Sequence, residues 1–243
     1  MPERPILSLL MLLCWTLPAM AQEIVVTGRV DLVNAGGKPS QGQQSNTVVW
    51  LTPLQPAAAQ SEAGKVDPAK HVRLTQKNKG FDPHVLVIPA GTSVEFPNLD
   101  PFFHNVFSLF EGKRFDLGLY EAGGTRFVQF DRPGISYIFC NIHPEMSATV
   151  IALSTPYFGR TNGFGNLAIR AVPAGRYVLH IWSERASPES AEAAAREVTL
   201  AADSSSLGTI KLQLTTDSLP SHKNKYGRDY DKPVPSNPVY EQP

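Results

Sequence analysis

Short apolar runs, separated by residues that favour turns, make up most of this chain. The runs are rich in Val, Ile, Thr and Phe, and turns such as 89–91 and 132–134 contain both Pro and Gly. This pattern favours antiparallel β structure, and 21 prolines and 18 glycines in 243 residues agree with it. Long helical periodicity is missing, and one short helix is predicted at 187–195. The sequence therefore predicts an all-β chain.

The central part of the chain, from residue 71 to residue 153, has the densest strand pattern. The predicted strands are 71–76, 84–89, 92–96, 104–108, 125–131, 135–140 and 147–151. Seven short strands in about eighty residues are typical of a small sandwich or barrel. We therefore predict a separate β domain at 71–153.

The flanking segments carry fewer strands. Those predicted before the central part are 24–31 and 47–52, and those after it are 166–171, 176–183, 197–200 and 208–214. Apolar residues occupy both faces of 176–183, which predicts a strand buried from two sides. A Pro- and Ala-rich stretch at 53–70 is expected to be a surface linker. Residues 219–243 are polar and Pro-rich without periodicity, which predicts a flexible tail.

The first residues have the pattern of a secretory signal peptide. An apolar run over 6–17 leads to an A-x-A sequence that ends at Ala21, so residues 1–21 are predicted to be removed by cleavage at about Ala21–Gln22. The run is too short to span a bilayer comfortably, so no membrane span is expected in the mature chain. The predicted location is periplasmic or secreted, and an uncleaved membrane anchor is the alternative.

Charge and cysteine content narrow the classes of function. Lys plus Arg equal Asp plus Glu, so nothing in the charge suggests a nucleic acid or a membrane surface as partner. Of two cysteines, Cys14 lies in the predicted signal peptide, and only Cys140 remains after cleavage. A single cysteine in an oxidising compartment has no intramolecular disulfide partner. Cys140 is therefore a buried bystander, an intermolecular bridge or a metal ligand.

The residues around Cys140 favour the metal. Cys140, His143 and Met146 form a C-x2-H-x2-M loop between two predicted strands, and His104 begins an earlier strand. One thiolate, two imidazoles and a thioether are the ligands of a blue-copper electron-transfer site. Asn105 follows His104, so we expect its backbone N–H to donate to the cysteine sulfur and tune the site. The sequence predicts one copper ion, as Cu²⁺ or Cu⁺.

The segment 71–153 resembles the cupredoxins, the family of plastocyanin, azurin and amicyanin. Residues 96–106 resemble the first-histidine segment of amicyanin-like proteins, and the loop with Pro144 has amicyanin's short spacing. The resemblance implies a Greek-key β-sandwich, copper ligands at His104, Cys140, His143 and Met146, and one-electron transfer. More narrowly, 81–158 resembles exported cupredoxin-like proteins labelled methylamine-utilisation proteins, a label that implies a genomic association. Glu145 departs from the family pattern, because its carboxylate stands where the shuttle proteins carry apolar residues.

The flanks carry a second resemblance. Residues 28–30 and 47–51, together with 169–182, resemble a transthyretin-like or carboxypeptidase-regulatory-like β-sandwich. Neither flank alone has enough strands to bury a core. One interpretation is a split domain built from 22–70 and 155–214, with the cupredoxin inserted. The other is two consecutive domains, with the N-terminal strands added to the cupredoxin.

The expected function is that of an exported type 1 copper protein in one-electron transfer, with an unidentified redox partner protein. The alternative is a periplasmic copper carrier, sensor or structural interaction module. An enzyme is not expected, because a trinuclear copper cluster needs His-x-His pairs and the six histidines form none. His84 is expected to be structural, and a second metal site there is the alternative.

Overall fold

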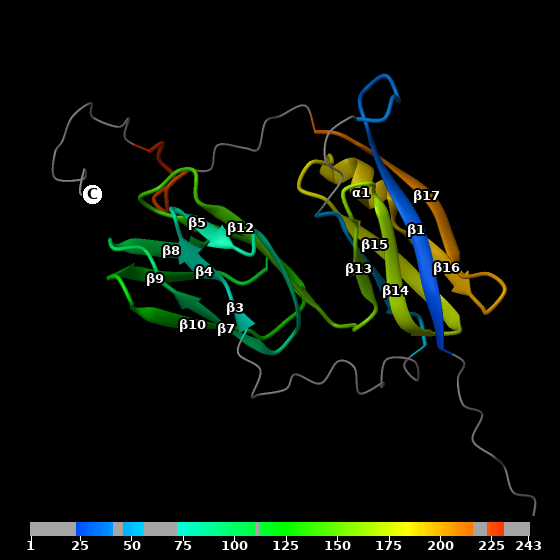
Figure 1. The fold of residues 1–243 in the computed structure, drawn as a ribbon, viewed down its shortest axis with the longest axis horizontal. Coiled ribbons are helices and arrows are strands. Elements are labelled where there is room, and N and C mark those ends of the chain that lie inside the picture. The colour runs from blue at the N-terminus through cyan, green and yellow to red at the C-terminus, as the bar shows by residue number, and fades with distance from the viewer. Residues whose placement is uncertain (1–22, 41–45, 56–71, 110–111, 216–222, 231–243) are drawn as a thin grey trace, which may run out of the picture.

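The computed structural model describes residues 23–40, 46–55, 72–109, 112–215 and 223–230. The predicted signal peptide, almost all of the predicted linker and both ends of the predicted tail lie outside the described residues. Within them the chain forms strands and a single short helix, arranged as two β-sandwiches side by side (Figure 1). The predicted all-β fold class is confirmed.

The first sandwich is built from the central part of the chain. Its larger sheet has the strand order β6 (Val85–Pro89), β12 (Ser147–Leu153), β11 (Gly134–Cys140), β8 (His104–Ser108) and β9 (Phe115–Tyr120). The second sheet contains β10 (Thr125–Phe130), β7 (Thr92–Pro97) and β3 (Val72–Arg73), and β4 (Thr75–Lys77) pairs with β5 (Gly80–Asp82). Large buried side chains such as Phe96, Phe130 and Ile138 fill the core of this sandwich.

The second sandwich combines both ends of the described chain. One sheet has the order β14 (Asn166–Pro173), β1 (Glu23–Val33) and β17 (Ser206–Gln213). The other has the order β13 (Phe158–Arg160), β2 (Val48–Pro53), β15 (Gly175–Trp182) and β16 (Arg196–Leu200). The N-terminal strands β1 and β2 therefore pair only with strands that follow residue 155. Strands from before and after the first sandwich in the sequence are thus hydrogen-bonded to one another, and the split domain stays a prediction.

The predicted short helix is confirmed as α1 (Pro188–Ala194). Ser187 is its N-cap, and the Ser187 side chain accepts a hydrogen bond from the backbone N–H of Ser190. This bond satisfies one of the free N–H groups at the helix start, and a proline in the first turn starts the helix without losing a bond. Among the described residues α1 is the only helix, and it does not have the length needed to cross a membrane.

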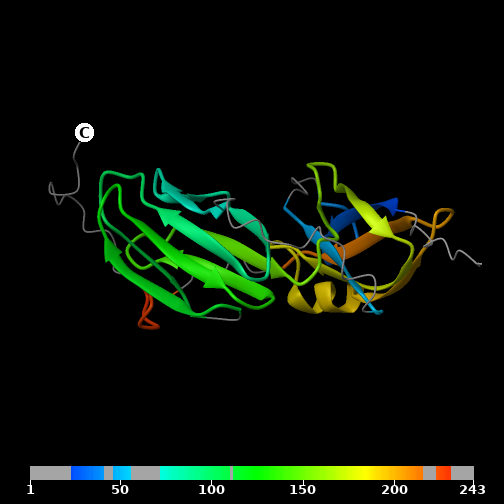
Figure 2. The same ribbon diagram turned by 90° about the horizontal axis from the view of Figure 1, so that it is seen from below.

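The two sandwiches lie next to each other (Figure 2) and share an apolar cluster, which explains strands that are buried on both faces. Along β12, Ala148 and Val150 pack into the core of the first sandwich, whereas Ile151 and Leu153 belong to a cluster that includes Trp182 of β15. Successive side chains of a strand point to opposite faces, so both faces must be apolar where both are covered. In β15 the same cause applies to Trp182, whereas Val178 and His180 on the same face are only half-buried.

A polar contact borders this interface. Nε2 of His84, just before β6, lies 2.8 Å from the carboxylate of Glu184, just after β15. His84 Nδ1 lies 3.1 Å from the carbonyl oxygen of Ser147. His84 is thus a structural contact between the sandwiches, as expected. It does not belong to the group of metal-ligand side chains found among the described residues.

The structure corrects the sequence interpretation in two places. Strands β5, β9 and β13 were not predicted, although Phe115, Leu117 and Leu119 alternate with polar or small residues in β9. Residues 223–230, predicted as part of a flexible tail, instead make hydrogen bonds to the first sandwich. Low hydrophobicity removes the usual sign of a packed segment, and these residues are held by polar contacts instead.

The alternation of β1 generates a stability prediction. Val26 is fully buried in the second core, whereas its neighbour Val25 is 45% exposed. We expect Val26→Ala to lower the free energy of unfolding by about 2 kcal/mol, from lost burial plus the cavity left behind. Val25→Ala is the matched control and should change it by less than about 0.5 kcal/mol. Denaturant unfolding followed by tryptophan fluorescence measures this, because Trp50 and Trp182 lie in the second sandwich. Equal effects of the two variants would contradict the burial of this face.

The contact between the sandwiches generates a pH prediction. The Glu184 side chain raises the pKa of His84 above its usual value, against the opposing effect of burial. A histidine whose pKa is raised in the folded state stabilises the folded protein. The full stabilisation is present below the unfolded pKa of about 6.5, and it is lost as pH rises through the folded pKa. His84→Gln should therefore lower the melting temperature more at about pH 6 than at about pH 9. A difference from wild type that does not change with pH would contradict this ion pair.

Candidate metal centre

The pairing of β8 with β11 brings the two predicted ligand segments together. Cys140 is opposite Val106 in this antiparallel ladder, and the backbone N–H of Asn141 donates to the carbonyl oxygen of Asn105 at 2.9 Å. His104 is two residues from Val106, so its side chain points to the same face as that of Cys140. Both side chains are fully buried. The loop that follows Cys140 then folds back and brings His143 to the same place.

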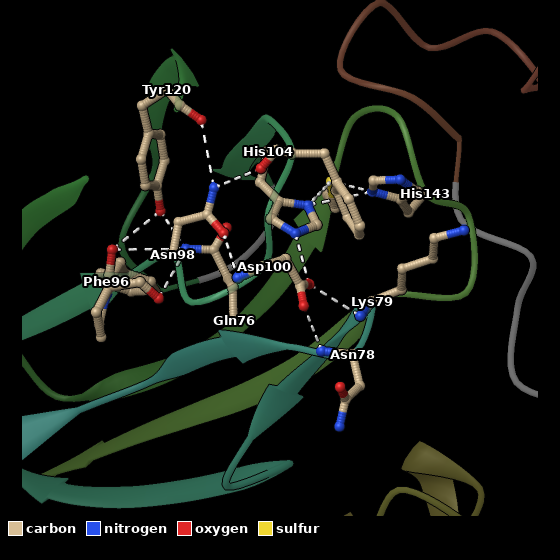
Figure 3. Close-up of polar contacts among 12 residues, drawn as sticks. Gln76, Asn78, Lys79, Phe96, Asn98, Asp100, His104, Tyr120 and His143 are labelled. Carbon is tan, nitrogen blue, oxygen red and sulfur yellow. Dashed lines mark hydrogen bonds and ion pairs between the residues drawn. The ribbon is translucent and has the colours of Figure 1, made fainter. Parts of the chain in front are cut away.

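Three nitrogen and sulfur donors converge at this point. The Cys140 Sγ lies 3.6 Å from Nδ1 of His104 and 3.5 Å from Nδ1 of His143, and the two Nδ1 atoms are 3.2 Å apart. These residues form the one group of three or more potential metal-ligand side chains of this kind within the described residues. His104 and His143 face each other across this point in Figure 3. The structure thus brings together three of the four predicted ligands through the atoms that bind metals.

The separations fit a single metal ion. Metal bonds are about 2.0 Å to nitrogen and about 2.3 Å to thiolate sulfur. If the three donors lie at the corners of a triangle around the metal, these bonds place the two nitrogens about 3.5 Å apart and each nitrogen about 3.7 Å from the sulfur. The measured distances agree with these values to within about 0.3 Å. Two histidines and one cysteine in a trigonal arrangement are the strong ligands of blue-copper sites. The residues therefore fit the predicted copper ion.

Asp100 orients His104, and sequence reasoning did not identify it. Its carboxylate oxygen lies 2.9 Å from Nε2 of His104, and both side chains are buried (Figure 3). An ionised carboxylate only accepts hydrogen bonds, so Nε2 of His104 carries the proton. Nδ1 then carries the lone pair and points it at the position shared with the other two donors, as a metal ligand requires. The only signal in the sequence was an aspartate four residues before the histidine.

The loop around Asp100 is itself held by hydrogen bonds. The Asn98 side chain accepts from the backbone N–H of Asp100 at 3.0 Å and donates to the carbonyl oxygen of Phe102 at 2.8 Å. The Asp100 carboxylate also accepts from the backbone N–H groups of Asn78 and Lys79. Burial alone would raise the pKa of Asp100, but these two N–H groups and His104 together lower it. Asp100 is therefore ionised at neutral pH.

Backbone N–H groups surround the cysteine sulfur. Burial raises the pKa of the Cys140 thiol, while hydrogen bonds from the backbone of Ile142, Asn105 and His143 act in the opposite direction. The direction of this effect agrees with the expected influence of the Asn105 N–H on the sulfur. A metal must displace the thiol proton before it binds, so these N–H groups prepare the sulfur for the thiolate form.

His143 is the most accessible of the three donors. It is half-buried, in contrast to His104 and Cys140. Burial lowers its pKa, and the neighbouring His104 lowers it further, which favours the neutral ring that binds metals. The Phe102 ring packs against both imidazoles, with centroid distances of 5.2 Å to His104 and 5.6 Å to His143. Phe102 thus shields the site from water.

Met146 closes the ligand loop. Its backbone N–H donates to the carbonyl oxygen of His143 at 3.1 Å, and its carbonyl oxygen accepts from the backbone N–H of Cys140 at 3.2 Å. Its side chain is fully buried in the same apolar cluster as Cys140. An axial thioether ligand at Met146 stays a prediction. Glu145 is exposed and lies outside the group of three donors.

Comparisons with known proteins come mainly from solved structures. No protein-family model and no curated protein sequence matches the chain. A purple cupredoxin from Nitrosopumilus maritimus is 23% identical, with 34% of this chain and 99% of that chain covered and a TM-score of 0.31. A Cu-containing nitrite reductase from Thermus scotoductus is 29% identical, with 42% and 27% covered and a TM-score of 0.34. A reduced mutant of amicyanin is 18% identical, with 43% and 98% covered and a TM-score of 0.33. At these TM-scores the likeness carries no argument about the site.

The buried carboxylate generates a prediction about metal affinity. Asp100→Asn removes the charge that fixes the His104 ring and its tautomer. We expect about a 10- to 100-fold loss of Cu²⁺ affinity, the usual effect of losing such an orienting partner. Competition with a chromophoric chelator measures it. Asp131→Asn is the control, because Asp131 is an exposed carboxylate that pairs with Lys113. An affinity of Asp100→Asn equal to that of the control would show that this hydrogen bond does not orient the ligand.

Proposed function

We propose that this protein is an exported cupredoxin that binds one copper ion and transfers single electrons. One observation carries the proposal: two imidazole nitrogens and a thiolate sulfur lie 3.2 to 3.6 Å from one another in a site that is largely buried. A reactive cysteine nucleophile would need a general base and an oxyanion site beside it. Here both neighbouring imidazoles instead point their nitrogens at one shared position.

The residues around the site support a fixed geometry. Asp100 holds the His104 ring, the ladder between β8 and β11 holds Cys140 beside it, and the backbone of Met146 closes the loop that carries His143. Bound copper would supply one-electron chemistry by cycling between Cu²⁺ and Cu⁺. Ligands that stay in place during this change need little rearrangement, which favours rapid electron transfer. Phe102 and the buried core exclude water from the donors.

His143 is the proposed route for the electron. It is the one donor with partial exposure, whereas His104 and Cys140 are enclosed by the first sandwich. Ile142 beside it is 46% exposed, and Glu145 adds a carboxylate to the same loop. A redox partner protein would therefore approach at this loop. The location, periplasmic or secreted, is proposed from the signal-peptide pattern alone.

A copper carrier or sensor is the second candidate function, because the second sandwich contributes none of the three donors. The two functions differ in redox behaviour. A shuttle requires reversible oxidation and reduction of the bound copper, measured by voltammetry. A carrier is indicated by tight Cu⁺ binding with weak Cu²⁺ binding. A catalytic role is not proposed.

The direct test is a Cu²⁺ titration of residues 22–243, followed by visible absorption and electron paramagnetic resonance. We expect one equivalent of copper to give an intense thiolate-to-copper band and narrow hyperfine splitting. Cys140→Ser should abolish both signals. His180→Gln is the control, because this half-buried imidazole stacks on Trp50 in the second sandwich and should leave them unchanged. A weak visible absorption that is the same in Cys140→Ser would contradict the proposal.

A further inference from the structure

A segment near the C-terminus lies against the ligand loop. We call residues 223–230 the C-terminal strap. The chain leaves the second sandwich after β17, and the strap, red in Figure 1, lies beside the first sandwich. In Figure 3 its ribbon runs next to the loop that carries His143. The strap is therefore far from the ligands in sequence but adjacent to them in space.

The strap holds the backbone of a metal ligand. The hydroxyl of Tyr230 donates to the carbonyl oxygen of Cys140 at 2.7 Å. The backbone N–H of Cys140 donates to the carbonyl oxygen of Met146 at the other end of the loop. Both backbone polar groups of the cysteine are thus engaged, one within the loop and one by the strap.

Lys225 connects the strap to both ligand segments. Its backbone N–H donates to the Asn141 side chain at 2.9 Å, and its Nζ lies 2.8 Å from Oδ2 of Asp116 in β9. The other oxygen of Asp116 accepts from the Asn105 side chain at 2.7 Å. Asn105 follows His104, and Asn141 follows Cys140. A single residue of the strap therefore bridges the segments of both buried ligands.

The strap has its own internal structure. The Asn224 side chain accepts hydrogen bonds from the backbone N–H groups of Tyr226 and Arg228. The backbone N–H of Asn224 donates to the carbonyl oxygen of Arg228, and that of Gly227 donates to Asn224. Gly227 has a φ of 73°, which a turn of this kind requires and glycine adopts without strain. This turn fixes the spacing between Lys225 and Tyr230.

We infer that the strap keeps the metal in place, with Tyr230 and Lys225 as positioning residues. The inference rests on the proposed function, because it concerns the release of copper. For the metal to leave, the loop with His143 must move away from His104. That movement breaks the hydrogen bonds between the strap and the two ligand segments. The strap therefore slows the opening of the site without touching the metal.

The test compares the rates at which copper passes from variants of the full chain to an excess of chelator. We expect Tyr230→Phe to speed release about 3- to 10-fold, the factor that one net hydrogen bond supplies. Lys225→Met should speed it about 2- to 5-fold, because the lost ion pair is partly exposed. The double variant should speed it by about 6- to 50-fold, the product of the two single effects. The thiolate-to-copper band should persist in each, because no ligand is changed.

Tyr226→Phe is the matched control. Tyr226 belongs to the same strap but is 71% exposed, and the substitution keeps the ring that lies against Lys225. Its release rate should equal that of the wild type. Release from the double variant at the wild-type rate would overturn the inference.

A second measurement separates this inference from the proposed function. Hydrogen exchange of the metal-free protein reports on the Cys140 and Asn141 N–H groups, which are bonded to Met146 and Asn105. We expect both to exchange faster in the double variant than in Tyr226→Phe. An absent copper band in the wild type would end the proposed function, while faster exchange would still establish the strap. Unchanged exchange would count against the strap even if the wild type binds copper.

Discussion

The short antiparallel ladder between β8 and β11 is the constraint on which the candidate metal centre depends. Pairing Cys140 with Val106 sets the face on which His104 emerges, since a shift by one residue would send its side chain to the opposite side of the sheet. With that register, the buried cysteine and histidine lie side by side. The compact loop that ends at Met146 then needs only to bring His143 to the same position.

Polar contacts support the site, and the residues that make them lie at increasing distances from the donors along the sequence. The loop with Asp100 orients His104 from four residues away, and β4–β5 supplies the N–H groups of Asn78 and Lys79 that keep the carboxylate ionised. The C-terminal strap reaches the opposite side of the site from beyond the second sandwich. Each of these contacts limits the movement of one of the three donor side chains or of the backbone that carries it.

The second sandwich is joined to the first through an apolar face. The side chains of β12 divide between the core of the first sandwich and a cluster shared with Val48 and Trp182. β12 is also the strand that continues from the ligand loop. The interface therefore holds the strand that follows Met146, which belongs to the same sheet as His104 and Cys140.

The sequence by itself determined the features that depend on short separations. The spacing of Cys140, His143 and Met146, the alternation along the strands and the capped helix at Ser187 are local, because periodicity and turn chemistry act over a few residues. His104 was predicted because a blue-copper site needs a second imidazole, and the resemblance to cupredoxins implied the same residue. The carboxylate of Asp100 was missed because its pairing with His104 depends on the shape of a loop, which the residue types alone do not specify. Only the tertiary structure decided that β1 pairs with β14 and β17, and that Tyr230 binds the backbone of Cys140. Such contacts join residues far apart in the chain, and their free energy depends on the whole fold rather than on any local pattern.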